Sequence, residues 1–180
     1  MFKKLYPYEY INNVFCIDYE KLYKQGYKGL IFDIDNTLVH HGEDSTPQID
    51  NLFSTIHSIG FKTLLLSNNT NERIQSFNKN INTLYICDAN KPNSTGYLKA
   101  LQMLNLPKEE VICIGDQLFT DILGANKVNI PNILVDFIRI NKNTKIGKKR
   151  QLENIILKFY KKNKSYTHRF GDITKKEAIK

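Results

Sequence analysis

Short apolar runs recur along the chain, and several of them end in polar residues. The first spans 29–34 and ends in carboxylates, and the second spans 62–67 and ends in a serine. Further short runs span 84–87, 111–115 and 132–136. Because these runs are mostly apolar throughout and do not alternate, they predict strands that are covered on both faces.

Helical periodicity fills the stretches between these strands. Apolar residues recur at helical spacing from 49 to 59, and Gly60 closes that segment. A second helix is predicted from Thr95 to Leu104 and a shorter one over 121–127. Strands that alternate with helices predict an α/β fold, in which helices cover both faces of a parallel central sheet.

The C-terminal part of the chain has a different pattern. Residues 151–162 predict an amphipathic basic helix, because five apolar residues share one side and the lysines fall largely elsewhere. These five are Leu152, Ile155, Ile156, Phe159 and Tyr160. The last segment, 164–180, shows no clear periodicity. We therefore divide the chain into an N-terminal segment that packs on the core or on a membrane (1–28), a core (29–140) and a basic C-terminal helix and tail (141–180).

The composition is that of one globular domain. The chain has 180 residues, of which 41% are hydrophobic and 24% are charged. No apolar run approaches the ~20 residues that a bilayer-spanning helix needs, and the first residues lack the apolar stretch of a secretory signal. Cys16, Cys87 and Cys113 share no metal-ligand spacing, so we expect reduced thiols and a cytoplasmic protein.

Positive charge is concentrated at the C-terminal end. Residues 1–138 hold 12 Lys and Arg against 15 Asp and Glu, whereas residues 139–180 hold 14 against 3. Such a tail suggests a polyanionic partner, either an anionic membrane surface or nucleic acid. Solvated lysines without a partner are an equally good interpretation of the same pattern. The sequence does not decide the oligomeric state.

Chemically active residues follow four of the predicted strands. They occur in the segments 33–38 and 67–70, at Lys91-Pro92 and in the segment 115–121. In open parallel sheets, ligands bind beyond the carboxyl ends of the strands. Asp33 and Asp35 stand two positions apart, so their side chains can face one ligand. A phosphoryl group is a suitable ligand, because a carboxylate can attack phosphorus and form a covalent intermediate.

These segments in this order resemble the haloacid dehalogenase (HAD) superfamily of phosphotransferases. Its motifs are D-x-D-x-T, a Ser or Thr after a strand, a basic residue, and G-D-x(4)-D. The matching residues are Asp33, Asp35, Thr37, Ser67, Lys91, Asp116 and Asp121. The resemblance implies a Rossmann-like, three-layer α/β/α core and phosphatase activity.

The resemblance also implies a role for each residue. Asp33 would attack phosphorus, and Asp35 would protonate the leaving oxygen and then take a proton from water. We expect crowding by like charges to keep a proton on Asp35. The remaining predicted site residues would bind the substrate phosphate, with Thr37 also orienting Asp33. They are Thr37, Ser67, Asn68 and Lys91, and a helix beginning at Asn68 or Asn69 would help to bind the anion.

A carboxylate and a phosphate repel each other, so the chemistry needs a cation. Mg²⁺ prefers a few oxygen ligands together with water and substrate phosphate. The resemblance implies that Asp33, the backbone carbonyl of Asp35 and the side chain of Asp116 hold Mg²⁺. Asp121 would hold a water bound to the metal.

The spacing of the motifs limits what else the domain contains. Only 32 positions separate Asp35 from Ser67, and 24 separate Ser67 from Lys91. The predicted helices and strands use both intervals, which are the places where this superfamily inserts cap domains. We therefore predict no cap domain and an active site that is open to solvent or to a bulky partner.

A finer resemblance is to the YqeG-like branch of subfamily IIIA. Its signatures look like the segments 33–38, 67–69, 91–92 and 115–121. Relatives of this branch dephosphorylate phosphatidylglycerophosphate, which suggests a lipid headgroup as substrate and a peripheral position on the inner face of the membrane. Nucleic-acid end phosphates, a soluble phosphorylated metabolite and a non-catalytic RNA- or ribosome-binding role remain alternatives.

Overall fold

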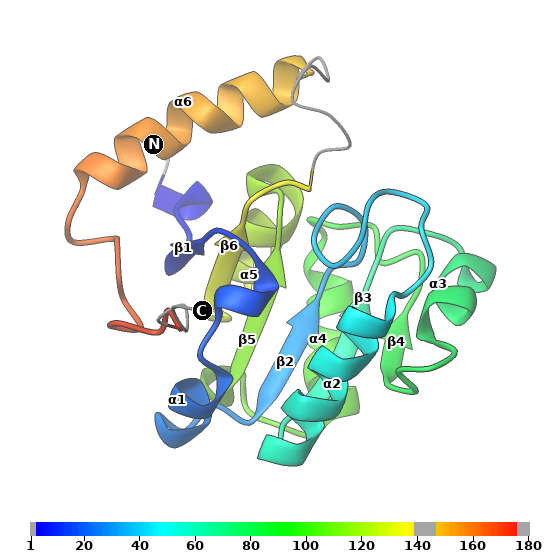
Figure 1. Ribbon diagram of the computed structural model, residues 1–180. Coiled ribbons are helices and arrows are strands. Elements are labelled where there is room, and N and C mark those ends of the chain that lie inside the picture. Colours follow the sequence, from blue (N-terminus) through cyan, green and yellow to red (C-terminus); the bar gives the residue numbers. More distant parts are fainter. Residues whose placement is uncertain (1–2, 139–146, 176–180) are drawn as a thin grey trace.

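A six-stranded sheet forms the centre of the molecule (Figure 1). The computed structural model describes residues 3–138 and 147–175, so parts of the predicted core and C-terminal segment lie outside the described residues. The strand order is β1-β6-β5-β2-β3-β4, and each neighbouring pair is parallel. The strands are β1 (Glu9–Ile11), β2 (Gly29–Phe32), β3 (Lys62–Leu66), β4 (Leu84–Ile86), β5 (Val111–Gly115) and β6 (Asn132–Val135).

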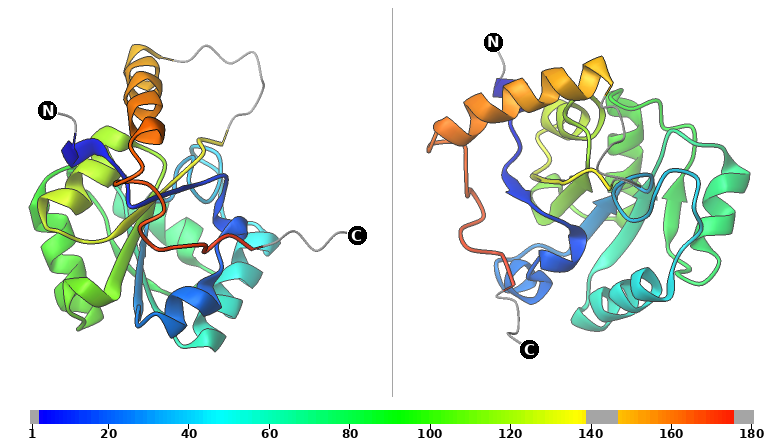
Figure 2. Two further views of the ribbon diagram at one scale, coloured as in Figure 1. Left: turned by 90° about the vertical axis from the view of Figure 1, so that its left-hand side faces the viewer. Right: turned by 45° about the horizontal axis from the view of Figure 1, so that its top comes forward.

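Helices cover both faces of this sheet, as Figure 2 shows. On β2, Leu30 and Phe32 belong to one apolar core and Ile31 belongs to another. The α/β/α architecture and the parallel sheet predicted from the sequence are therefore confirmed. The helices are α1 (Tyr19–Lys24), α2 (Pro47–Ile59), α3 (Asn71–Asn78), α4 (Ser94–Leu104), α5 (Leu123–Lys127) and α6 (Lys148–Lys162).

The bounds of α2 follow from its end residues. The Thr46 side chain accepts a hydrogen bond from the backbone N–H of Ile49, and Pro47 occupies the first turn. The helix stops at Gly60, which has a φ of 109° and so takes the left-handed conformation that glycine tolerates best. The predicted helix is thus present, and it begins at Pro47.

The short helix predicted over 121–127 has an irregular start. Residues Leu118–Ile122 form a π-helical turn, and α5 follows directly at Leu123. Tyr97 of α4 fixes this turn, because its hydroxyl donates to the backbone carbonyls of Thr120 and Asp121. The wider turn therefore places Asp121 against the core with 1% of its surface exposed.

The N-terminal segment contributes an edge strand to the sheet. In the register of β1 with β6, Tyr10 pairs with Leu134. The sequence pattern did not predict β1, because a three-residue strand containing Glu9 and Tyr10 lacks a continuous apolar run.

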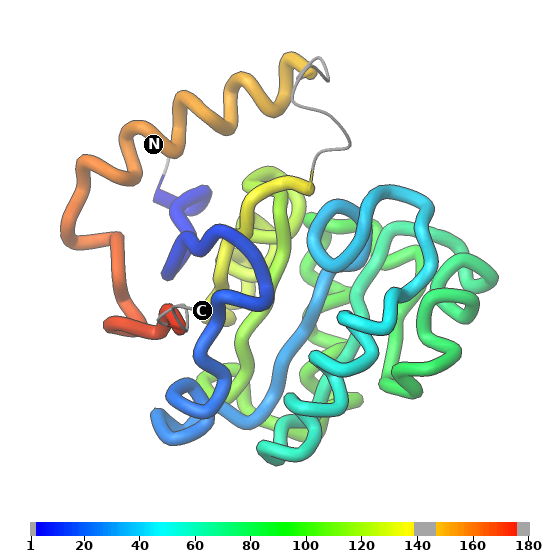
Figure 3. The backbone as a smooth tube through the Cα atoms, in the orientation of Figure 1, coloured from blue at the N-terminus to red at the C-terminus, as the bar shows by residue number. Residues whose placement is uncertain are grey.

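The C-terminal segment lies alongside this N-terminal segment (Figure 3). The backbone N–H of Arg169 donates to the carbonyl of Tyr8, and the N–H of Asp18 donates to the carbonyl of Ile173. Phe170 and Ile173 are buried, although no periodicity marks this segment in the sequence. The two ends of the described chain thus pack against each other.

Helix α6 crosses the molecule beyond the carboxyl ends of the strands (Figure 1). Ile156 and Tyr160 are buried in a core shared with Tyr6, Leu118 and Leu134. The other three apolar residues of the predicted face are about half exposed, so that face is divided between the core and solvent; they are Leu152, Ile155 and Phe159. Among the described residues, no helix is both long enough and apolar enough to cross a membrane.

Candidate active site

The ends of three central strands bring the predicted site residues together. Asp33 follows β2, Ser67 follows β3 and Asp116 follows β5, and β2 pairs with both of the other strands. A cavity of about 310 Å³, which we call the main cavity, opens there. Its lining includes Asp33, Asp35, Ser67, Asn68 and Lys91.

Three buried carboxylates form an acidic cluster at this edge. Asp33, Asp116 and Asp121 each place one carboxylate oxygen within 4.8 Å of the others. Hard divalent cations prefer oxygen ligands of this kind, and three close carboxylates supply the negative charge that such an ion offsets. The residues present therefore fit a divalent metal ion.

The side chain of Asp35 lies outside this cluster. One of its oxygens accepts from the backbone N–H of Gly42 at 2.8 Å and from Arg73 at 3.3 Å, and the other accepts from Asn69. These contacts are with hydrogen-bond donors, and the expected role of like charges in keeping a proton on Asp35 stays a prediction. Its predicted contribution to the metal site through the backbone carbonyl stays a prediction.

Lys91 links two members of the acidic cluster. Its Nζ lies 2.5 Å from Asp33 Oδ1 and 2.7 Å from Asp121 Oδ1, and its side chain is 5% exposed. Burial works against the charged amine, but the Asp121 and Asp33 carboxylates outweigh it and raise the pKa of Lys91. Lys91 is therefore a fixed positive charge beside the predicted nucleophile.

Burial changes the ionisation of the acidic side chains. The pKa of Asp33 is raised to about 6. Burial is the largest cause and the Asp121 carboxylate adds to it, whereas Lys91 and Thr37 act in the opposite direction. The pKa of Asp116 is also raised, by burial and by the charges of Asp33 and Asp121, against the effect of Arg150. A cation at this cluster would favour the ionised forms of both carboxyl groups.

Two predicted phosphate-binding residues contact protein groups. Thr37 is 1% exposed, and its hydroxyl donates to Asp33 Oδ2 at 2.8 Å. Asn68 accepts from the backbone N–H of Lys91 at 2.6 Å and donates to the Lys91 carbonyl at 3.3 Å. Thr37 thus orients Asp33, and Asn68 holds the loop that carries Lys91.

The helix expected to begin at Asn68 or Asn69 begins later. Thr70 is the N-cap of α3, whose first residue is Asn71. The reason is local, because Ser67 Oγ accepts from the backbone N–H of Asn69 and the segment turns before the helix starts. Ser67 lines the cavity, and its contact with phosphate stays a prediction.

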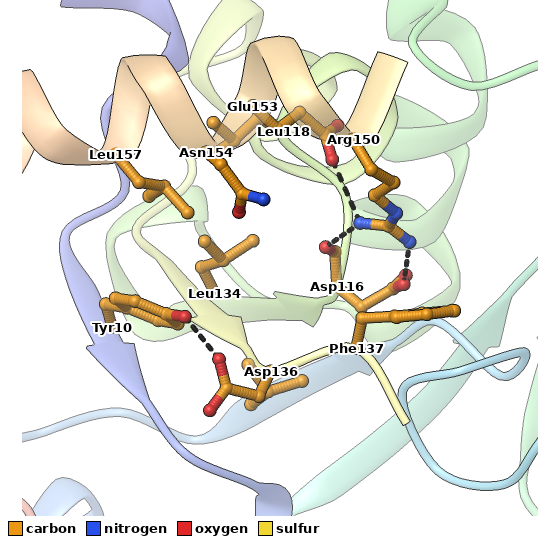
Figure 4. A pocket seen from close by; sticks show the side chains of 11 residues that line it. Tyr10, Asp116, Leu118, Leu134, Asp136, Phe137, Arg150, Glu153, Asn154 and Leu157 are labelled. Atoms are coloured by element: carbon orange, nitrogen blue, oxygen red, sulfur yellow. Dashed lines mark hydrogen bonds and ion pairs between the residues drawn. The ribbon is translucent and has the colours of Figure 1, made fainter. Parts of the chain in front are cut away.

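Arg150 of α6 also belongs to the site, although no sequence motif marks it (Figure 4). Its Nη1 donates to the backbone carbonyl of Asp116 at 2.5 Å, its Nη2 pairs with the Asp116 carboxylate, and Glu153 accepts from Nη1 at 3.0 Å. A second cavity, of about 270 Å³, lies beside this contact between α6 and β6. The one signal was that Arg150 is the single arginine of a lysine-rich helix.

Two more basic residues reach the same region. Arg73 of α3 contacts Asp35, as described above, and Lys149 of α6 lines the main cavity beside Gln117. His41 also lines it, although its side chain is 76% exposed. The predicted absence of a cap domain holds within residues 3–138, since the two intervals contain only α2 with β3 and α3 with β4.

Comparisons with known proteins find phosphatase relatives of this chain. A HAD-hydrolase-like family model matches residues 88–137. The protein named probable phosphatase YqeG of Bacillus subtilis is 37% identical over 137 residues, which cover 75% of this chain and 80% of that protein.

Solved structures resemble the fold. The cobalt-bound deoxy-D-mannose-octulosonate 8-phosphate phosphatase of Haemophilus influenzae is 14% identical, with a TM-score of 0.50 over 79% of this chain and 92% of that one. A haloacid dehalogenase-like hydrolase of Streptococcus pneumoniae is 17% identical, with a TM-score of 0.50 over 61% and 85%.

Proposed function

This chain belongs to the YqeG-like phosphatase family of the HAD superfamily, and we propose that it is an Mg²⁺-dependent phosphomonoesterase acting on phosphatidylglycerophosphate at a membrane surface. The observation that best supports this reaction is the acidic cluster of Asp33, Asp116 and Asp121. Lys91 forms ion pairs with two of its members, Asp33 and Asp121. Together these residues provide a nucleophile, a cation site and a fixed positive charge at one edge of the sheet.

The first half of the reaction transfers the phosphoryl group to the protein. The Asp33 carboxylate attacks phosphorus, and the bond between phosphorus and the leaving oxygen breaks. Asp35 lines the same cavity and gives a proton to that leaving oxygen. The products of this half are the alcohol and an aspartyl-phosphate at Asp33.

The second half releases inorganic phosphate. Asp35, now ionised, takes a proton from a water molecule, whose oxygen attacks phosphorus and regenerates the Asp33 carboxylate. Asn69, Arg73 and the Gly42 N–H hold the Asp35 side chain in place through the hydrogen bonds given above. These contacts fix the position from which Asp35 exchanges the proton.

The residues around Asp33 have distinct supporting roles. Thr37 orients the attacking carboxylate, and Lys91 keeps it ionised and adds positive charge. Ser67 and Lys91 bind phosphate oxygens, whereas Asn68 acts by holding the Lys91 loop. Asp33, Asp116 and the backbone carbonyl of Asp35 would hold Mg²⁺, with Asp121 behind them. When bound, the ion would offset the charge of the phosphate.

The lipid substrate is supported by the shape and charge of the surroundings. No cap domain is inserted within residues 3–138, so a headgroup displayed on a surface can approach Asp33. Lys149 lines the cavity on the α6 side, and basic residues near an anionic bilayer contribute about 1 kcal/mol each.

A substrate panel tests this function. Phosphate release would be measured with Mg²⁺ for phosphatidylglycerophosphate in anionic liposomes, a sugar phosphate, a nucleotide and a nucleic-acid end phosphate, using wild type and Asp33→Asn. We expect wild type to prefer the lipid and Asp33→Asn to be inactive on every substrate. Release from the soluble or nucleic-acid substrates alone would exclude the lipid assignment while leaving the phosphatase chemistry in place.

A further inference from the structure

The outward side of α6 exposes three large apolar side chains. Leu152, Ile155 and Phe159 are 47%, 50% and 55% exposed. Their spacing of three and four residues puts them in one stripe on the helix. Ile156 and Tyr160 make the contact with the protein core, whereas the three residues of this stripe belong to none of the apolar cores formed by the described residues.

Lysines surround the stripe. Lys148 stands four residues before Leu152, and Lys162 stands three residues after Phe159, so both share its side of the helix. We call these five residues (Lys148, Leu152, Ile155, Phe159 and Lys162) the outer face of α6. The one acidic residue of α6, Glu153, is buried and paired with Arg150, so the exposed charges of the helix are positive.

The outer face lies at the same end of the molecule as the active site. Arg150 joins α6 to Asp116 at the carboxyl end of β5, and Lys149 of α6 lines the main cavity. The helix has 15 residues and is therefore about 22 Å long. Because α6 and this cavity lie at the same end of the sheet, a surface that contacts the outer face is brought toward Asp33. Figure 1 shows α6 beyond the carboxyl ends of the strands.

We propose that the outer face of α6 docks on an anionic lipid bilayer. An apolar stripe edged by lysines matches such a surface, because the apolar side chains enter the boundary of the acyl chains and the amines contact anionic headgroups. A nucleic acid would use the lysines but would gain little from Leu152 and Ile155, and a second copy of α6 would bring lysines against lysines. The proposal deepens the proposed function by naming the surface that holds the enzyme on its lipid.

Vesicle binding tests the proposal. Full-length protein would be sedimented with vesicles of neutral phosphatidylcholine, with or without anionic phosphatidylglycerol. We expect binding to the anionic vesicles, and a loss of at least about ten-fold in the triple variant Leu152→Ser, Ile155→Ser, Phe159→Ser. Leu98→Ser on α4 is the matched control, because Leu98 is also 50% exposed, and it should bind like wild type.

Two further measurements separate docking from catalysis. Hydrolysis of p-nitrophenyl phosphate in Mg²⁺ should be unchanged in the triple variant, since none of the three residues lines the main cavity. Phosphate release from detergent-dispersed phosphatidylglycerophosphate tests the proposed function without a bilayer. Wild type that hydrolyses the dispersed lipid but ignores anionic vesicles would overturn docking alone. Wild type that binds vesicles through this face but releases no phosphate would overturn the proposed function alone.

Other outcomes would also contradict docking on lipid. Equal vesicle binding by wild type and the triple variant would place the contact elsewhere on the protein. A dimer in size-exclusion chromatography that the triple variant abolishes would assign the face to a second copy. Binding of RNA that the same substitutions weaken, without vesicle binding by wild type, would assign it to nucleic acid.

Discussion

Asp33 must be ionised to attack phosphorus, yet its side chain is buried. Its pKa of about 6 lies above its ordinary value of 3.8 because burial disfavours the carboxylate more than Lys91 and Thr37 favour it. The folded protein therefore binds a proton at Asp33 over a pH range in which the unfolded chain has released it. Asp33 therefore contributes less to the stability of the metal-free protein as pH rises from about 4 to about 6.

The first prediction concerns this loss of stability. Removing the titratable group with Asp33→Asn should stabilise the metal-free protein at pH 7 relative to wild type, by on the order of 3 kcal/mol, and by much less at pH 4. Urea unfolding in the presence of EDTA across this pH range measures the difference. A difference that stays constant from pH 4 to pH 7 would show that Asp33 is not the group responsible.

The second prediction concerns Arg150, which holds the Asp116 side chain and backbone together. Arg150→Ala leaves the buried Asp116 and Glu153 carboxylates without this partner, so it should lower the free energy of unfolding by about 3 kcal/mol. Arg150→Lys keeps the charge but loses the forked contact, and should restore only part of that loss. Urea unfolding checks both variants. In the background of Asp116→Asn the cost of Arg150→Ala should shrink; an unchanged cost would mean that the pair does not carry it.

At the scale of elements, apolar runs predicted five of the strands, and the polar residues after them predicted the site. This worked because central parallel strands are buried on both faces and their carboxyl ends meet at one edge. Elements without a continuous apolar run were harder to predict. β1 is only three residues long, and the first turn of α6 consists of Lys148, Lys149 and Arg150, which carry no apolar signal.

The third prediction concerns the packing of α5 against α4. A Cβ at Gly124 would overlap the ring of Tyr97, whose hydroxyl holds the turn that carries Asp121. Gly124→Ala should therefore push these elements apart, cost about 1–3 kcal/mol in the free energy of unfolding and reduce Mg²⁺ affinity. Thermal unfolding and calorimetric titration with Mg²⁺ measure the two effects.

Gly147→Ala serves as the control for this substitution. A Cβ at Gly147 meets no atom within 4 Å, and its φ of −60° suits any residue. Gly147 is the N-cap of α6, where alanine is less favourable than glycine, so the unfolding temperature should fall slightly while the Mg²⁺ affinity matches that of wild type. If Gly124→Ala behaved in the same way, the close contact with Tyr97 would not constrain the position of Asp121.

At the scale of the whole molecule, contacts between distant segments were out of reach of the sequence pattern. Arg150 and Asp116 are 34 positions apart in the sequence. Arg169 and Tyr8, which share a backbone hydrogen bond, lie near opposite ends of the chain. Patterns of hydrophobicity describe each element by itself, whereas these contacts depend on how the ends fold back over the sheet. The motifs nevertheless identified Asp33, Asp116, Asp121 and Lys91, because each directly follows a strand or belongs to the turn after it.

If Asp33 receives the phosphoryl group, the aspartyl-phosphate can be trapped and located in the chain. Wild type would be mixed with substrate and Mg²⁺, quenched in acid within the first turnover, digested and analysed by tandem mass spectrometry. We predict a phosphorylated peptide with the modification on Asp33, and none in Asp33→Asn. Continued turnover with the phosphate on another residue, or undiminished activity in Asp33→Asn, would contradict the account.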